Sequence, residues 1–95
     1  MKLVVWKTEA LNDIDRLVGF LLPKSPTAAQ RAFTAIEEAA TRLGEFPSIG
    51  RPLAEMPIGY RELLVPFSSS GYRILYLDAE PVQILAVRHM REDQY

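Results

Sequence analysis

Residues 60–89 read YRELLVPFSSSGYRILYLDAEPVQILAVRH, and this stretch decides the fold. Runs rich in apolar, aromatic and β-branched residues cover positions 60–67, 72–77 and 82–89. The tetrapeptide Ser-Ser-Ser-Gly separates the first run from the second, and Asp-Ala-Glu-Pro separates the second from the third. Turns this short join neighbouring antiparallel strands. The stretch therefore predicts a three-stranded antiparallel meander.

Ahead of the meander, the sequence first predicts a strand and a helix. Leu3–Trp6 is a short β-rich run, Thr8 is a candidate N-cap residue, and Pro23 ends the helix. Apolar residues recur at helical spacing and form one stripe. They are Leu11, Ile14, Leu17, Val18, Leu21 and Leu22. The charged residues Glu9, Asp13, Asp15 and Arg16 form the opposite face, which we interpret as a solvated one.

A second helix follows after a very short linker. Ser25 is the expected N-cap and Pro26 the first helical residue, while Gly44 is a plausible C-terminal cap. Its stripe consists of Ala29, Ala32, Phe33, Ile36, Ala40 and Leu43. Small residues let two helices approach closely. Because only residues 23–25 join them, the two helices should form an antiparallel hairpin.

The segment 46–59 is rich in proline and glycine and predicts a long loop, a type of segment that is often functional. With its 95 residues the chain is expected to form a single domain spanning residues 1–95. The predicted fold class is α+β with the order β-α-α-β-β-β. We expect an antiparallel sheet with the two-helix hairpin packed on one face.

Both faces of the predicted meander are apolar. Tyr72, Ile74 and Tyr76 share one face, and Arg73 and Leu75 share the other, so neither face alternates cleanly with polar residues. A hairpin of two helices covers only one face. The second face would then be a partner site, because exposed apolar patches rimmed by charge usually bind other proteins. The alternative is that the 46–59 loop and the C-terminal tail fold over it.

Composition narrows the classes of function. The net charge is −1, whereas domains that hold nucleic acid by charge usually have a basic excess. The chain has no cysteine and one histidine, so we expect no disulfide and no metal site, and the sequence suggests no cofactor. The longest apolar run has four residues and no signal peptide is recognisable, so the expected location is cytoplasmic, away from any membrane.

A metal-independent cleavage of RNA is one chemistry that the remaining residues allow. It needs a base, an acid and a cation beside the phosphorane. The candidates are Arg61, Arg73, His89, Arg91 and Tyr95. Arg73 and His89 lie on adjacent predicted strands and could meet. The competing interpretation is that a lone histidine at a strand end has a structural or surface role.

The chain resembles the RelE/ParE superfamily of bacterial type II toxins, and most closely its ParE branch. The resemblance runs nearly from end to end, although no single piece is specific. Its pieces are Trp6 at the end of the first strand, Glu9 to Leu22, Ser25-Pro26, Leu43, Pro47, Gly50-Arg51-Pro52, Gly59-Tyr60-Arg61-Glu62-Leu63, Tyr72-Arg73-Ile74-Leu75-Tyr76, Val87-Arg88-His89 and Arg91-Glu92-Asp93.

The resemblance implies a toxin that a co-expressed antitoxin holds inactive. The antitoxin would be ParD-like, with a DNA-binding ribbon-helix-helix at its N-terminus and a C-terminal segment that wraps the toxin. ParE-like members poison DNA gyrase by binding, which implies growth arrest and plasmid stabilisation. The residues expected to contact partners are Arg51, Arg61, Leu63, Arg73, Leu75, His89 and Arg91.

RelE-like members instead cut mRNA on the ribosome, typically with lysine and arginine residues and a late tyrosine. This chain has no lysine after Lys24, which favours the ParE branch. Some nucleases of the superfamily use a glutamate, an arginine and a late histidine. Glu55, Arg73 and His89, with Tyr95, would take those roles here, so the endonuclease remains an alternative. A non-toxic, degenerate member is a further alternative.

Overall fold

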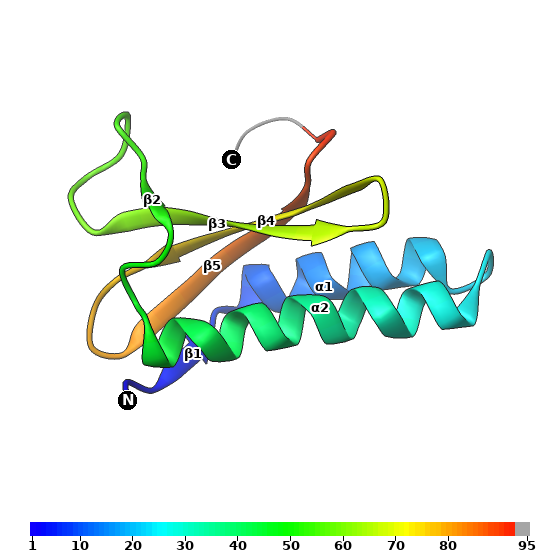
Figure 1. Cartoon of the computed structure of the whole chain (residues 1–95), viewed down its shortest axis with the longest axis horizontal. Helices are drawn as coiled ribbons and strands as arrows, with labels where there is room; N and C mark the ends of the chain where they lie inside the picture. Colours follow the sequence, from blue (N-terminus) through cyan, green and yellow to red (C-terminus); the bar gives the residue numbers. More distant parts are fainter. Residues whose placement is uncertain (93–95) are drawn as a thin grey trace.

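The computed structural model describes residues 1–92 and confirms the α+β class (Figure 1). The predicted order of elements is also confirmed, with one two-residue strand added. The elements are β1 (Val4–Trp6), α1 (Thr8–Leu21), α2 (Pro26–Glu45), β2 (Arg51–Pro52), β3 (Tyr60–Phe67), β4 (Ser70–Leu77) and β5 (Val82–His89). The turn between β3 and β4 is shorter than predicted, because only Ser68 and Ser69 lie outside the strands.

The five strands form one sheet in the order β1-β5-β4-β3-β2. The three meander strands pair antiparallel as predicted, and β2 adds to β3. The edge strand β1 pairs parallel with β5, so the expectation of a wholly antiparallel sheet is wrong at this pairing. The helix hairpin leads from β1 to β2 at the opposite edge of the sheet, so no short turn joins β1 to β5 and forces the two strands to run antiparallel.

Two predicted helix caps differ from the structure. The helix α1 begins at Thr8 itself, and Lys7 is its N-cap without a side-chain bond. The amide of Lys7 bonds to the carbonyl of Ile84, so β1 leads straight into the helix. Gly44 lies inside α2, because the chain continues helically to Glu45. Ser25 is confirmed as an N-cap, since its hydroxyl accepts from the amide of Ala28 at 3.1 Å.

The helices cover one face of the sheet, with α1 along β5 and α2 along β3 (Figure 1). Tyr76, Ile36, Leu43, Ile74 and Ile84 are the largest side chains that this layer buries completely. A register shift beside Leu75 and Tyr76 breaks the regular alternation of side chains along β5. Ala86 consequently pairs with Leu75 and Val87 with Ile74, so Val87 joins the helix-side core.

The second face of the sheet is not bare, contrary to the expectation of missing cover. Leu53 and Met56 from the loop after β2 pack on Leu75 and Ala86. Arg73 is also buried on this face, with 8% of its surface exposed. The alternative that the 46–59 loop folds over the sheet is therefore confirmed for this part, while the end of the tail, residues 93–95, lies outside the described residues.

Replacing a glycine with alanine should have opposite effects on stability at two positions within the helices. A Cβ on Gly19 would meet nothing within 4 Å, whereas a Cβ on Gly44 would lie 2.8 Å from the backbone oxygen of Lys2. Gly19→Ala should therefore stabilise the protein by about 0.5–1 kcal/mol through helix propensity. Gly44→Ala should destabilise it by about 1–3 kcal/mol, because the segment before β1 must move. Urea unfolding of both variants checks this, and equal signs would contradict it.

Candidate partner-binding surface

The seven residues predicted to contact partners do not share one surface. The strand register places Arg61, Leu63 and His89 on the helix side of the sheet. It places Arg51, Arg73 and Leu75 on the opposite side. Leu63 and Leu75 are both buried in the separate cores of the two faces. Only part of this set can therefore contact one partner at one site.

Two of the predicted contact residues hold the loop in place. The Arg51 guanidinium donates to Oε1 of Glu62 at 2.8 and 3.1 Å, and the Glu62 side chain is 1% exposed. The Nη1 atom of Arg61 donates to the carbonyl of Gly50 at 2.8 Å, and its Nε lies 3.7 Å from Oδ2 of Asp78. Both arginines therefore make internal contacts that a partner would have to keep or replace.

The phenol of Tyr76 fixes the start of the same loop. Its hydroxyl donates to the carbonyl of Pro47 at 2.7 Å and accepts from the amide of Gly50 at 2.9 Å. Burial raises the pKa of Tyr76, although the Gly50 hydrogen bond and the charge of Arg61 oppose this. The hydroxyl therefore keeps its proton and can donate it to Pro47.

Asp13 joins the helix layer to the sheet. The interpretation of its helix face as solvated is therefore wrong at this residue. Its Oδ2 atom accepts from the amide of Val87 at 2.9 Å and from Nη1 of Arg88 at 2.7 Å. Its Oδ1 lies 3.5 Å from Nη2 of Arg16. The contacts with Val87 and Arg88 span 74 and 75 positions in sequence, which explains why helical periodicity did not reveal them.

Arg73 and His89, the pair proposed for RNA cleavage, lie on opposite faces of the sheet. In the register Arg73 pairs with Arg88, and His89 pairs with Tyr72. The rings of His89 and Tyr72 meet edge to face at 5.5 Å, while Arg73 donates to the carbonyl of Glu92 at 2.8 Å. Adjacent strands therefore do not bring the two side chains together. Glu55 lies exposed in the loop after β2, and Tyr95 is outside the described residues.

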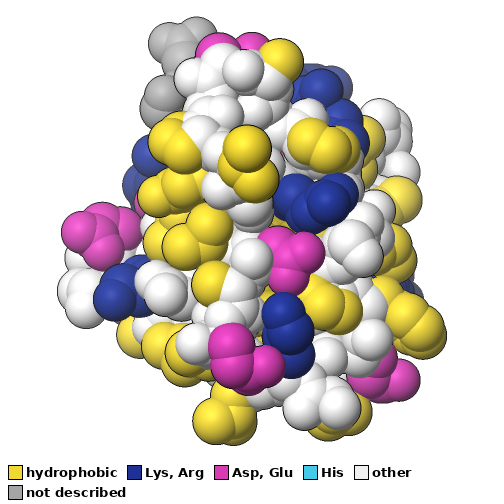
Figure 2. All heavy atoms as spheres, turned by 90° about the vertical axis from the view of Figure 1, so that its left-hand side faces the viewer, with side chains coloured by type: hydrophobic (Ala, Val, Ile, Leu, Met, Phe, Trp, Pro, Cys, Tyr) yellow, Lys and Arg dark blue, Asp and Glu magenta, His cyan; other side chains and the backbone are white. Residues whose placement is uncertain are grey.

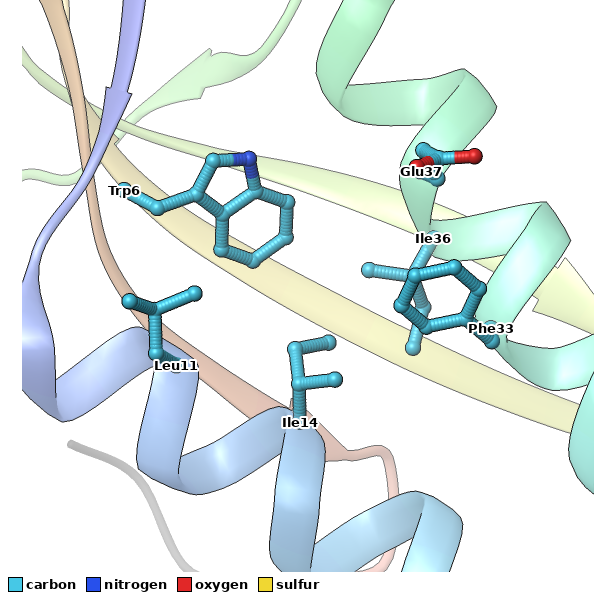
Figure 3. Close-up of a pocket in the computed structure, with 6 residues that line it drawn as sticks. All are labelled: Trp6, Leu11, Ile14, Phe33, Ile36 and Glu37. Atoms are coloured by element: carbon cyan, nitrogen blue, oxygen red, sulfur yellow. The ribbon is translucent and has the colours of Figure 1, made fainter.

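The helix layer carries an apolar hollow that the sequence did not predict, which we call the helix cleft. It has a volume of about 200 Å³ and is lined by Trp6, Leu11, Ile14, Phe33, Ile36 and Glu37. Figure 3 shows side chains from both helices and from β1 converging on it. Leu11 and Phe33 were assigned to core stripes, yet they are 50% and 40% exposed. The volume suits one large apolar side chain of a partner.

A second and larger hollow lies between the helix ends and the β3–β4 turn, and we call it the tip groove. It has a volume of about 650 Å³. Its lining includes Arg16, Phe20, Phe67, Tyr72, His89 and Arg91. Burial raises the pKa of Tyr72, so its phenol stays neutral there. His89 and Arg91 are thus the two predicted contact residues that one hollow brings together.

The end of the molecule that carries the loop has exposed apolar residues but no continuous apolar face. Ile58, Phe46 and Ile49 are among them. Figure 2 shows hydrophobic side chains at this end interrupted by adjacent basic and acidic side chains. The ion pair of Lys2 with Asp78, at 3.3 Å, is one such contact among the described residues.

The width of the helical stripes was the signal that could have revealed the two hollows. Successive helical residues turn by about 100°, and the buried residues Ala10, Ile14 and Leu17 define the centre of the inner face of α1. Leu11 lies at one margin of that face and Phe20 at the other. Apolar residues at both margins exceed what one core seam needs, which indicates contact with a partner.

Glu92 predicts a pH dependence of stability. Burial alone would raise its pKa, but the amide of His89 and the guanidinium of Arg16 outweigh this and hold the pKa below its ordinary value. A lowered pKa in the folded state means that the carboxylate stabilises the fold above the unfolded-state pKa of about 4.3. This contribution is lost as the pH falls through the folded-state pKa.

The free energy of unfolding of Glu92→Gln and of the parent should therefore converge as the pH falls from 7 towards 3. Urea titrations at several pH values measure this difference. Glu38→Gln, on the exposed side of α2, is the control for the loss of a carboxylate. A gap between Glu92→Gln and the parent that stays constant over the whole range would contradict the assignment.

Within residues 1–92, no group of three or more His, Cys, Asp or Glu side chains is arranged to hold a metal ion. No helix in that range is long and apolar enough to cross a membrane.

Known proteins that are similar to this chain belong to one class. The family model described as the ParE toxin of the type II toxin-antitoxin system, parDE, matches residues 4–94. Toxin RelE3 of Caulobacter vibrioides is 33% identical over 93 residues, covering 97% of this chain and 98% of the relative. Toxin RelE2 of the same organism is 38% identical over 90 residues, with coverage of 94% and 96%. 

The fold has a solved counterpart as well. The structure of a chromosomal ParDE toxin-antitoxin system from P. aeruginosa gives a TM-score of 0.74 at 20% identity, and the match covers 94% of this chain and 96% of that one. Fold and sequence together define a type II toxin of the RelE/ParE superfamily. The chain belongs to the ParE toxin family of type II toxin-antitoxin systems. Membership implies a cognate antitoxin as its partner.

Proposed function

We propose that this toxin arrests growth by binding and inhibiting DNA gyrase, without catalysing a reaction of its own. The observation that supports this most is the separation of Arg73 and His89 by the sheet. A nuclease must place its acid, base and cation around one phosphate. The match to the ParE family model agrees with a binding toxin.

The state of the arginines on the sheet also supports binding over RNA cleavage. Arg51 is paired with Glu62, Arg88 with Asp13, and Arg73 donates to a backbone carbonyl. Residues 46–95 contain five arginines, no lysine and six acidic residues, so this half has a net charge of −1. Holding a polyanion requires cations that can release its counterions. A protein target requires less, because an apolar patch with a few arginine anchors suffices.

An mRNA endonuclease is the second candidate, since curated relatives are named as RelE toxins. The test is to express the chain alone and to follow both targets. We expect inhibited supercoiling by purified gyrase at micromolar toxin, together with DNA damage signalling and intact mRNA. Unaffected supercoiling with discrete cuts in translated mRNA would establish the nuclease. If neither target is affected, the chain is a non-toxic member and the proposal fails.

The variant His89→Gln separates the two candidates at the level of one residue. A gyrase-binding toxin should keep nearly all of its toxicity, because glutamine retains a hydrogen-bond donor. A nuclease that uses His89 as acid or base should lose on the order of 10²-fold in cleavage. Growth curves after induction, with thermal unfolding as the control for an intact fold, measure the effect. Loss of toxicity with unchanged thermal unfolding would favour the nuclease.

A further inference from the structure

The tip groove combines an apolar floor with an open mouth. Phe20 is 64% exposed although Leu17, one turn before it in α1, is buried. The ring of Phe67 packs on Tyr72 at 5.7 Å and closes the side formed by the β3–β4 turn. In Figure 1 this turn lies over the hairpin, near the end of α1 and the start of α2. The groove is large enough for more than one side chain.

The polar wall of the groove presents donors. The Nδ1 atom of His89 accepts from the amide of Arg91 at 3.1 Å, so its Nε2 carries a proton and can donate it. The Arg91 side chain makes no ion pair with any residue in the range 1–92, and the residue is exposed. A guanidinium and an imidazole N–H on one wall favour a ligand that carries a hydrogen-bond acceptor.

Glu92, the acidic residue of the lining, does not offset these donors. Its Oε2 accepts from Arg16 at 2.8 Å and its Oε1 from the amide of His89 at 2.8 Å. Both oxygens are therefore used within the wall. The helix cleft has a negative charge in its lining, because Glu37 is its charged lining residue. The two hollows of the helix layer thus favour ligands of opposite charge.

We propose that the antitoxin fills the tip groove with a large apolar side chain that stands next to an aspartate or glutamate. The apolar side chain lies on Phe20 and Tyr72, and the carboxylate accepts from Arg91 and from Nε2 of His89. Membership of a type II toxin family identifies the antitoxin as the partner. The apolar floor and the donor wall of the tip groove indicate the chemistry of the segment that binds there. The proposal holds whether the toxic target is gyrase or mRNA.

Two small probes of equal shape test the chemistry of the groove. They are 3-phenylpropionate, which carries a carboxylate, and 3-phenylpropylamine, which carries an ammonium group. In NMR titrations the acid should shift the His89 and Phe20 signals and saturate at about 1–10 mM, as expected for so few atoms. The amine should bind there at least about 10-fold more weakly, because it meets the like charge of Arg91. Equal binding of both probes would overturn the charge argument.

Charge reversal in the chain supplies the matched variants. Arg91→Glu should weaken binding of the acid at least about 10-fold, since the carboxylate then faces a like charge. Arg31→Glu changes an exposed arginine of α2 that does not line the groove, and it should leave binding unchanged. Phe20→Ser should abolish the shifts while the rest of the spectrum stays folded. If the acid shifts Trp6 and Phe33 instead, the site is the helix cleft and the proposal is wrong.

The purified complex with the cognate antitoxin then identifies the occupant. In the complex, 3-phenylpropionate should no longer shift His89 or Phe20, because the antitoxin already fills the groove. Unchanged binding of the probe to the complex would show that the antitoxin docks elsewhere. Signals of the groove that change with the concentration of the free toxin would instead identify a second copy as the occupant. Either result would overturn the proposal.

Discussion

Replacing Asp13 with alanine should lower the free energy of unfolding by about 3 kcal/mol, which is a large share of the stability of a small domain. The substitution removes the carboxylate that accepts a hydrogen bond from the amide of Val87, and Val87 is fully buried. It also leaves the Arg88 guanidinium without its carboxylate at 2.7 Å. Within residues 1–92, no strand other than β1 pairs with this edge of β5, so Asp13 takes the place of a strand beyond the end of β1.

The neighbouring Asp15 is the matched control for Asp13. It is exposed on the same helix, so Asp15→Ala should change stability by no more than about 0.5 kcal/mol. Asp13→Asn keeps an oxygen for the Val87 amide but loses the charge. Its loss in the free energy of unfolding should therefore lie between those of Asp13→Ala and Asp15→Ala. Urea denaturation with linear extrapolation gives all three values. Similar losses for Asp13→Ala and Asp15→Ala would show that the carboxylate does not hold the edge.

Local signals in the sequence predicted the elements, whereas contacts between distant elements escaped them. The prolines, the serine turn and the Ser25 cap act within a few residues, so the bounds of β3 and β5 agree with the prediction. The shift beside Leu75 and Tyr76 depends on how β5 meets both β1 and β4, which periodicity does not contain. The parallel pairing of β1 with β5 was not predicted for the same reason.

The candidate site was predicted less well than the fold, and charge explains much of the difference. Arginines of a strand look available in a sequence, because the groups that accept their hydrogen bonds lie far away along the chain. Arg88 donates to the carboxylate of Asp13 across 75 positions, and Arg73 donates to the backbone carbonyl of Glu92 across 19. The apolar residues that do remain exposed, such as Phe20 and Phe33, lie in helices whose stripes resemble ordinary core seams. The partner surface was therefore expected on the sheet, although the two apolar hollows lie on the helix side.

Gly50→Ala should also destabilise the protein by about 3 kcal/mol, at the upper end of the range for overpacking a core. An added Cβ would lie 2.7 Å from the Tyr76 hydroxyl and 2.8 Å from the backbone oxygen of Glu62. Because Tyr76 is completely buried, neither neighbour can yield without moving the loop. The loop carries Leu53, so its release would expose Leu75 and Ala86 on the sheet. Binding of a dye for apolar surface should therefore rise along with the loss of stability.

Tyr76→Phe tests whether the clash or the lost hydrogen bonds cause this effect. The variant keeps the ring but loses the bonds to Pro47 and Gly50, and it should cost about 2 kcal/mol. Combined with Gly50→Ala, it removes the hydroxyl oxygen that lies 2.7 Å from the new Cβ, while the ring atom Cε1, also at 2.7 Å, remains. The double variant should therefore lose clearly less than the sum of the single losses, as coupled neighbours do. Strict additivity would mean that the remaining neighbours, Cε1 of the ring and the backbone oxygen of Glu62, limit the space at Gly50, and that the hydroxyl does not position the loop through this contact.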